Sequence, residues 1–368
     1  MQPHDPSEPK LTQTLLHDVR RGDFRRTLRR DWSELKEFYL DDVRKSRLLQ
    51  MGTLKRFFVA GWWLVKSLLF KLTPARRVLL ALGFILLLSS SSINYQGHDV
   101  AFNNDTKTFG FLILLFILML ELKDKLLAQN ELEAGRSVQR ALMPQTSPSV
   151  AGWELWLTTK PANEVGGDLV DYLELGGNRH GIALGDVAGK GLKAALLMVK
   201  LQATLRALAA DYVSLALLGG KLNAIFRRDG LPQSFISLVY LELQAGSDNV
   251  RLLNAGHLPP ILLREYKFTE LPQGTAVLGV LAEPHFTELQ FTLQVGEILI
   301  IYSDGLIEAR NEVGEFYGES RLNNFLPTLS GLSAAEAGVR LLAEVERFVG
   351  EARAHDDLSL VVLKRVSA

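Results

Sequence analysis

The feature that most constrains the fold is a change of texture at Trp153, after which short runs of alternating apolar and polar residues continue to the end of the chain. Gly, Pro and Asn separate these runs, as turn residues do between β-strands. Helical patterns interrupt them at 191–209, 213–228 and 333–349. Hairpin-like strands with helices inserted between them favour an α+β domain of antiparallel sheets flanked by helices. The predicted strands are WELWLTTK, DLVDYLEL, HGIALGD, FISLVYLEL, NVRLLNAG, FTLQV, EILIIYSDG and LSLVVLKRV.

Three apolar stretches precede this domain, at 57–70, 78–95 and 108–120. The second is eighteen residues long without a charge, and the third has thirteen uncharged residues, against the roughly 20 that a membrane-spanning helix needs. We expect transmembrane helices at about 78–95 and 107–122. The alternative is a buried helical hairpin, which is disfavoured because nothing nearby in the sequence is suited to cover two such apolar helices. The first stretch contains Lys66 and a pair of tryptophans, which favour an interfacial helix.

The charges flanking these stretches predict an orientation. Residues 1–77 hold 17 Lys and Arg against 9 Asp and Glu, a net charge of +8 that leaves −8 for residues 78–368 of a chain that is neutral overall. By the positive-inside rule both ends of the apolar region face the cytoplasm, which predicts a multi-pass inner-membrane protein with its N-terminus and its α+β domain in the cytoplasm. The start of the chain has no cleavable signal-peptide pattern. The acidic remainder argues against a nucleic-acid groove.

A polar helix is expected to join the apolar region to the α+β domain. Residues 123–144 keep a helical pattern until Pro144 ends it, and their apolar positions are irregular for a heptad. The segment therefore suits a plain spacer and a dimerising linker equally. The predicted organisation is a basic helical arm at 1–56, a membrane region at 57–122, this linker helix, and the α+β domain at 145–368.

Aspartates stand at the ends of several predicted strands. Two belong to Gly-Asp pairs eighteen residues apart, in EVGGD and LGDVAGKG, a third belongs to IIYSDG, and two more belong to HDD. Such residues converge from distant parts of a sheet, and carboxylates with backbone carbonyls and water suit Mg²⁺ or Mn²⁺. The chain has no cysteine, which excludes thiolate metal sites and cysteine nucleophiles. The candidate residues are Asp168, Asp186, Asp304, Asp356 and Asp357.

A centre of this kind favours hydrolysis at phosphorus. With two bound ions, a bridging water loses a proton near neutral pH and attacks a phosphorus centre in line. GDVAGKG is not a nucleotide-binding P-loop, because Leu184 stands five residues before Gly189 and Gly191 replaces the Ser or Thr of that motif. A single aspartate of the set is well explained as a turn residue or a helix cap. Four acidic points on separate strands favour a functional centre.

The order of the motifs resembles a known family. RALMP, PANEVGGDLVDYLEL, IALGDVAGKGLKAALLM, FISLVYLEL, LLNAGHLPPILL, GEILIIYSDGLIEARN and HDDLSLVVL occur across residues 139–365 in the order typical of SpoIIE/RsbU-type bacterial serine/threonine phosphatases, relatives of the PP2C (PPM) family. The resemblance implies a PP2C-like αββα sandwich with a dimetal centre at one edge. It also implies two Mn²⁺ or Mg²⁺ ions as cofactors and hydrolysis of phosphoserine or phosphothreonine.

The resemblance assigns roles by motif. It implies that Asp168 and Asp186 are metal ligands with the Val187 backbone carbonyl beside them, and that Asp304 holds one ion. The last ligand falls in the Asp-Asp pair, where the family pattern favours Asp356 and leaves Asp357 as the alternative. These aspartates would act in catalysis through the metals and their bridging water.

The resemblance also implies a partner. The usual substrate in the family is a phosphorylated regulatory protein, an anti-sigma-factor antagonist of the STAS type, and N-terminal modules usually control the phosphatase through a linker helix. The prediction is a membrane-anchored phosphatase in sigma-factor signalling, with a homodimer through the linker helix as one means of control. One alternative is a catalytically silent pseudophosphatase acting as a membrane scaffold, which the intact acidic set disfavours. A two-metal nuclease is disfavoured by the −8 charge.

Three further residues have open roles. Asp171, three residues beyond Asp168, either supports the metal site or is a solvated strand residue. Lys190 either attracts a phosphate or suits a helix entry between two glycines. His257 lies where the resembling family has a structural turn. The arginine that binds phosphate in eukaryotic relatives has no match in the sequence.

Overall fold

The structure is a computed structural model. It describes four stretches of the chain, residues 41–88, 105–144, 148–229 and 234–367. The contacts divide the chain into two compact units, Met1–Leu126 and Leu127–Ala368, so that the boundary falls within one long helix. Most of the predicted N-terminal arm, residues 1–40, lies outside the described residues.

The described part of the first unit is helical. Arg76 joins two of its helices through bonds to Glu121 at 2.7 Å and to Asp124 at 2.6 Å. The same two helices approach closely at two glycines, since a Cβ on Gly110 would lie 2.8 Å from the carbonyl oxygen of Gly83. The helices are α3 (Asp42–Leu49), α4 (Thr53–Lys71), α5 (Pro74–Leu88) and the first part of α6 (Asp105–Leu142).

These helices correct the membrane prediction. Within the described part of the chain, no helix combines the length and the apolar character needed to cross a membrane. Helix α5 has 15 residues, which span about 22 Å against a hydrocarbon core of roughly 30 Å. Helix α6 has 38 residues, but its uncharged run is thirteen residues long, and Glu121, Lys123 and Asp124 follow within the same helix.

The predicted transmembrane helices at 78–95 and 107–122, and the multi-pass inner-membrane location inferred from them, are therefore wrong. Residues 89–95 of the first predicted span lie outside the described residues. The interfacial placement of 57–70 depended on those two spans and loses its basis. In the structure that stretch is the middle of α4, and residues 107–122 and the predicted linker run together in α6.

The described residues of the second unit form ten strands in two five-stranded antiparallel sheets. They are β1 (Trp153–Lys160), β2 (Leu169–Gly176), β3 (Arg179–Val187), β4 (Ile236–Gln244), β5 (Asn249–Ala255), β6 (Ile261–Arg264), β7 (Lys267–Glu270), β8 (Glu288–Thr292), β9 (Ile298–Tyr302) and β10 (Leu358–Arg365). Sheet A has the strand order β1-β10-β9-β6-β7, and sheet B has the order β2-β3-β4-β5-β8. Every neighbouring pair is antiparallel.

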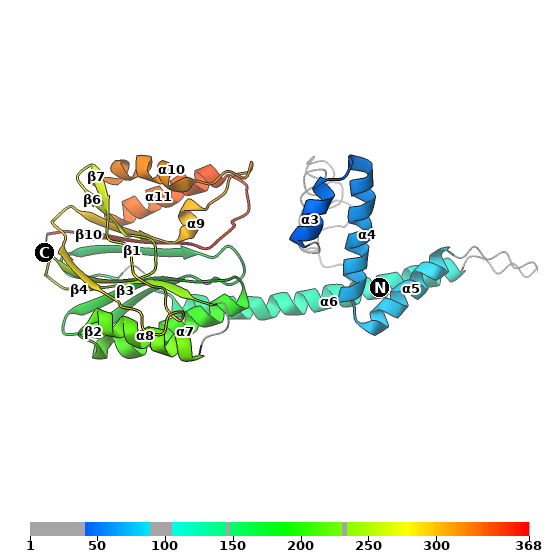
Figure 1. Ribbon diagram of the computed structural model, residues 1–368, viewed down its shortest axis with the longest axis horizontal. Helices are drawn as coiled ribbons and strands as arrows, with labels where there is room; N and C mark the ends of the chain where they lie inside the picture. The colour runs from blue at the N-terminus through cyan, green and yellow to red at the C-terminus, as the bar shows by residue number, and fades with distance from the viewer. Residues whose placement is uncertain (1–40, 89–104, 145–147, 230–233, 368) are drawn as a thin grey trace, which may run out of the picture. The chain divides into compact units, whose positions relative to one another are not determined.

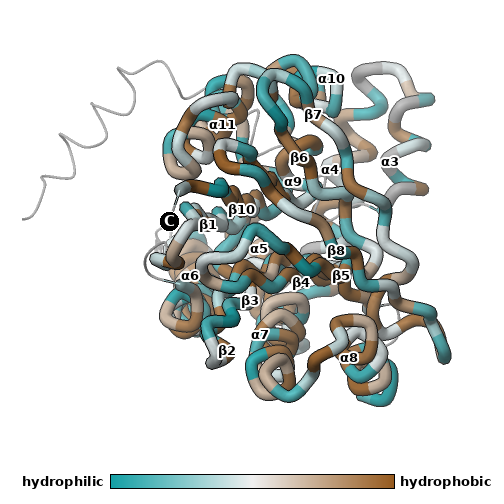
Figure 2. The backbone as a smooth tube through the Cα atoms, turned by 90° about the vertical axis from the view of Figure 1, so that its left-hand side faces the viewer, coloured by the Kyte–Doolittle hydropathy of each residue, from teal (hydrophilic) through white to brown (hydrophobic). Residues whose placement is uncertain are grey.

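Helices cover the outer face of each sheet. They are α7 (Leu192–Leu208), α8 (Leu215–Asp229), α9 (Asp304–Ile307), α10 (Gly318–Phe325) and α11 (Ala334–Val349), with short 3-10 helices at Ala209–Asp211 and Leu326–Leu329. Figure 1 shows α7 and α8 below the strands and α10 and α11 above them, and the side view in Figure 2 shows the same layers. The predicted αββα sandwich of two antiparallel sheets flanked by helices is confirmed.

The alternation along the strands explains the layers. In β4, Leu238 and Tyr240 pack with the residues of α7 and α8, while Val239 and Leu241 pack between the two sheets. Successive side chains of a strand point to opposite faces of the sheet. A strand that is apolar at every position therefore has both of its faces buried. A third apolar layer lies between sheet A and its helices, with Leu341 of α11 among its members. This packing brings the ends of strands from both sheets to one edge.

Candidate metal centre

The five predicted aspartates come from both sheets and gather at the ends of strands. Asp168 directly precedes β2 and Asp186 is the last residue but one of β3, both in sheet B. Asp304 begins α9 just after β9, and Asp356 and Asp357 directly precede β10, both in sheet A. The charges of Asp304, Asp356 and Asp357 all act on Asp186, and the charges of Asp186 and Asp357 act on Asp168. The structure therefore brings the whole predicted set together.

Asp357 holds the loop that leads to Asp168. Its Oδ1 accepts the backbone N–H of Ala162 at 2.8 Å, and its Oδ2 accepts the backbone N–H of Gly167 at 2.6 Å. A Cβ on Gly166 would lie 2.6 Å from the same Oδ2, which explains a glycine at that position. Both carboxylate oxygens of Asp357 are thus occupied by backbone donors, and the side chain is 8% exposed.

The second glycine of EVGGD faces the turn that follows β3. A Cβ on Gly167 would lie 3.2 Å from the carbonyl oxygen of Val187, so this carbonyl lies beside the residue that precedes Asp168. Gly189 and Gly191 have φ of 114° and 73°, in the left-handed region that side-chain-bearing residues avoid. The Gly-Lys-Gly turn therefore needs both glycines to lead the chain from Asp186 into α7.

Lys190 lies between those two glycines and joins the two halves of the cluster. Its Nζ is 2.8 Å from Oδ2 of Asp356 and donates to the backbone carbonyl of His355 at 2.7 Å. Of the five aspartates, Asp356 is the one with an ion pair among the described residues. Lys190 therefore lies in the turn that leads into α7 and balances the charge of Asp356 on the side of the other sheet.

The cluster has more negative charge than its surroundings balance. Burial, and then the charge of Asp186, raises the pKa of Asp168 well above its usual value. Burial, and then the charges of Asp304 and Asp356, raises the pKa of Asp186 to about 7. Burial and the charge of Asp356 also raise the pKa of Asp304. In addition, Oδ2 of Asp168 is buried with no hydrogen-bond partner among the described residues.

These properties fit hydrated divalent cations. A buried carboxylate oxygen without a donor, among carboxylates that repel one another, is a site where a bound cation lowers the free energy. The donors are all oxygens, the set that Mg²⁺ and Mn²⁺ prefer. In the described residues no group of three or more His, Cys, Asp or Glu side chains is placed to hold a metal ion by itself. Mg²⁺ usually takes one or two carboxylates and keeps several waters, so a complete cage is not required.

Asp171 has a role that neither sequence-based alternative anticipated. Its side chain is fully buried, and its two oxygens accept from Nε and Nη2 of Arg206, each at 2.7 Å. Arg206 lies on α7, so this bidentate ion pair holds the helix against β2. The pair is separated by 35 residues in the chain, and the only signal for it was a single arginine late in an otherwise largely apolar helix.

Gln139 of α6 was missed by sequence reasoning. Its side chain is 4% exposed and forms two hydrogen bonds with the backbone of Gly166, donating from Nε2 to the carbonyl at 2.7 Å and accepting the N–H at Oε1 at 3.1 Å. The loop before Asp168 is therefore held by Gln139 on one side and by Asp357 on the other. The available signal was one uncharged polar residue directly before the RALMP motif.

His257 joins the two sheets near the cluster. Its Nε2 is 3.1 Å from the backbone carbonyl of Tyr302, which only accepts, so Nε2 carries the proton and Nδ1 accepts from the hydroxyl of Ser237 at 2.6 Å. Ser237 pairs with Asp186 across the strands, and Tyr302 stands two residues before Asp304. Burial lowers the pKa of His257 to about 4, so the ring is neutral at pH 7. It is a fixed connection between the strands that carry the two aspartates.

Comparison with known proteins agrees with this arrangement. The family model for Stage II sporulation protein E (SpoIIE) matches residues 176–366, slightly more than half of the 368 residues. The chain is 27% identical over 265 residues to Protein IcfG of Synechocystis sp., a match that covers 64% of this chain and 41% of IcfG. It is 24% identical over 239 residues to Phosphoserine phosphatase RsbU of Bacillus subtilis, covering 64% of this chain and 70% of RsbU.

A solved structure shows the same fold. The SiaA-PP2C domain of Pseudomonas aeruginosa superposes with a TM-score of 0.57 at 19% sequence identity, over 66% of this chain and 98% of that domain. The fold of the second unit is therefore that of PP2C domains. The chain spans less than half the length of IcfG, the first of the relatives above.

Proposed function

The chain belongs to the SpoIIE family, and from this premise we propose that it is a metal-dependent protein serine/threonine phosphatase. The observation that carries the proposal is the cluster of five aspartates, drawn from both sheets, in which burial and mutual repulsion raise the pKa of Asp186 to about 7. Such a cluster is costly unless cations bind it. The similarity to RsbU, a phosphoserine phosphatase by name, supports phosphoserine as the substrate class.

The residues that would hold two Mn²⁺ or Mg²⁺ ions are Asp168, Asp186, Asp304 and Asp356, with the carbonyl of Val187. When bound, such ions activate water and neutralise charge on the phosphoryl oxygens. The protein holds the oxygens of its own aspartates and of the Val187 carbonyl in position. Gln139 and Asp357 hold the loop before Asp168, and His257 connects the strands of Asp186 and Asp304.

Within the Asp-Asp pair we assign the metal to Asp356. Each oxygen of Asp357 already accepts one backbone N–H group and has one lone pair left, and the side chain is buried against the loop that it holds. Asp356 is partly exposed, and its ion-pair partner is the flexible side chain of Lys190. Oδ1 of Asp356 accepts the backbone N–H of Asp357 at 3.0 Å, so Oδ2 is the oxygen that becomes available to an ion after a small movement of Lys190.

The partner we propose is a phosphorylated regulatory protein, an anti-sigma-factor antagonist of the STAS type. The motif order shared with SpoIIE/RsbU-type phosphatases and the similarity to RsbU support this choice. We also propose that residues 123–144, most of which lie in α6, act as a linker helix and a dimerisation surface. The linker role is supported by Gln139 near the end of α6, which bonds directly to the loop before Asp168. The intact acidic set argues against a catalytically silent scaffold.

The test is hydrolysis of an aryl phosphate by the full chain with Mn²⁺, with Mg²⁺ and with a chelator. We expect turnover that requires metal and that falls at least about 100-fold in Asp186→Asn, since even indirect support of a metal ligand is worth about 10–100-fold. Asp248→Asn, an exposed aspartate outside the cluster, is the matched control. Turnover that survives both the chelator and Asp186→Asn would contradict the proposal. Metal binding without turnover on any phosphorylated substrate would instead support the scaffold.

A further inference from the structure

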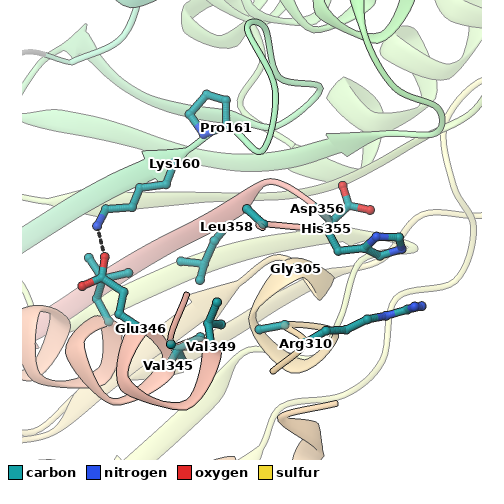
Figure 3. A pocket seen from close by; sticks show the side chains of 14 residues that line it. Lys160, Pro161, Gly305, Arg310, Val345, Glu346, Val349, His355, Asp356 and Leu358 are labelled. Carbon is teal, nitrogen blue, oxygen red and sulfur yellow. Dashed lines mark hydrogen bonds and ion pairs between the residues drawn. The ribbon is translucent and has the colours of Figure 1, made fainter. Parts of the chain in front are cut away.

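A mostly apolar pocket lies beside the aspartate cluster, between the start of β10, α9 and the end of α11 (Figure 3). It has a volume of about 430 Å³, within the range of pockets that bind organic groups. It shares Asp356 with the cluster, and Gly305, the neighbour of Asp304, also lines it. Its apolar walls are Pro161, Ala309, Leu342, Val345, Val349 and Leu358.

The two ends of the pocket differ. At one end Lys160 and Glu346 form an ion pair with each other, so their charges are already balanced. At the other end Asp356, His355 and Arg310 stand together (Figure 3). The apolar part of the pocket therefore lies next to Asp356, the residue that it shares with the aspartate cluster.

Arg310 supplies a positive charge at that second end. Its guanidinium lies 4.5 Å from the centre of the Phe316 ring, which holds it by a cation–π contact. Its Nε is buried and has no hydrogen-bond partner among the described residues. A guanidinium is well suited to bind phosphate or carboxylate oxygens. The pocket mouth thus combines a cation for an anionic group with an apolar cavity directly behind it.

The metal chemistry does not use the apolar walls. Apolar surface left in contact with water costs free energy, and a concave apolar surface beside an active centre is usually filled when substrate binds. An extended peptide advances about 3.3–3.6 Å per residue. A side chain a few residues from a phosphorylated serine at the cluster therefore reaches a pocket that begins at Asp356.

We propose that this pocket binds a large apolar side chain of the phosphoprotein substrate, within about three residues of the phosphorylated serine or threonine. Arg310 binds the phosphate or an acidic side chain of the same segment. The assignment rests on the proposed phosphatase function and adds a sequence preference to it. An occupant other than a peptide, such as a small apolar molecule, would leave peptide hydrolysis without any such preference.

The test uses the full chain and pairs of phosphoserine peptides. The two peptides of a pair differ at one position, which carries Leu in one and Ala in the other. The pairs cover each position from three residues before the phosphoserine to three after it. We expect one position at which Leu raises kcat/KM about tenfold over Ala, the discrimination that an apolar pocket gives for a few methylene groups. Val349→Trp fills the pocket and should reduce this ratio to about one. Ala335→Trp, on the exposed side of the same helix and outside the pocket, should keep the ratio.

Ala354→Trp, at the exposed rim of the pocket, repeats the test if Val349→Trp does not fold. Equal rates for the Leu and Ala peptides at every position, or a ratio that survives both tryptophan variants, would overturn the proposal. Aryl phosphate hydrolysis by the same preparations separates the two levels of inference. Metal-dependent hydrolysis of aryl phosphate without a peptide preference rejects the pocket alone, whereas its absence rejects the phosphatase function and the pocket with it.

Discussion

Sheets A and B bring carboxylates to the same place by different means. On the sheet B side, Asp168 and Asp186 are held close to other carboxylates by buried backbone, and the pKa of each is raised. On the sheet A side, Asp357 accepts two backbone N–H groups, and Asp356 accepts one and pairs with Lys190. Both carboxylates on the sheet B side therefore need a cation, whereas on the sheet A side this holds for Asp304, whose pKa burial and Asp356 also raise, beside two aspartates that already have partners.

The largest difference is expected between the neighbours Asp356 and Asp357. Asp356→Asn should lower phosphatase turnover at least about 100-fold with little change in the free energy of unfolding, because it removes an ion ligand and a partly exposed ion pair. Asp357→Asn should lower the free energy of unfolding by about 1.5–3 kcal/mol, because an amide cannot accept both N–H groups. Urea denaturation and aryl phosphate turnover of both variants provide the measurement.

Each variant is the control for the other. A loss of stability in Asp356→Asn together with an unchanged stability in Asp357→Asn would exchange the two assignments. The assignment of metal binding to Asp356 and of loop support to Asp357 would then be wrong.

A smaller effect is expected at the glycine against Asp357. Gly166→Ala places a methyl group 2.6 Å from Oδ2 of Asp357, so the loop before Asp168 has to shift. We expect a loss of about 1–3 kcal/mol in the free energy of unfolding, as for other overpacked sites, and weaker binding of Mn²⁺ in calorimetry. Gly220→Ala is the matched control, because this glycine of α8 has no atom within 4 Å of an added Cβ.

Helix propensity alone should make Gly220→Ala neutral or more stable by up to about 1 kcal/mol. Equal stability and equal Mn²⁺ affinity in Gly166→Ala and the wild type would show that the contact between this loop and Asp357 is not needed.

The last expected effect concerns pH and is the smallest when it is counted per pH unit. The pKa of Asp186 is about 7 in the folded chain against 3.8 for an ordinary aspartate, so the folded state holds a proton that the unfolded state releases. The free energy of unfolding of the metal-free chain should therefore fall as pH rises from about 4 to 7, by at most about 1.4 kcal/mol per pH unit from this group. The raised pKa values of Asp168 and Asp304 act in the same direction.

Denaturation in chelator across this pH range measures the slope. Asp186→Asn should flatten it, and Asp248→Asn should leave it unchanged. Added Mn²⁺ should stabilise the chain increasingly with pH, because the ion competes with the proton. A metal-free chain that gains stability between pH 4 and 7 would mean that sheet B does not supply unbalanced charge.

The regular elements followed closely from local pattern. The β1 strand coincides with the predicted WELWLTTK, and α7, α8 and α11 lie within one or two residues of their predicted ranges. The hairpin of β6 and β7 was missed because its turn carries no glycine or asparagine. Glu265 adopts the left-handed conformation there with φ of 52°, which gives no signal in the sequence. Helix α10 was missed because it is eight residues long and buries one leucine.

The sequence by itself determined which faces of the strands are buried and that aspartates stand at their ends, because alternation and turn residues act within a few positions. Only the tertiary structure decided which aspartate does what. Asp357 contacts Gly167 across 190 residues, and Asp171 finds Arg206 on a helix rather than a metal. The structure also decided where the apolar helices end, so that no helix of the described residues is both long and apolar enough to cross a membrane. These outcomes depend on where distant segments meet and on where helices end, which a local pattern does not encode.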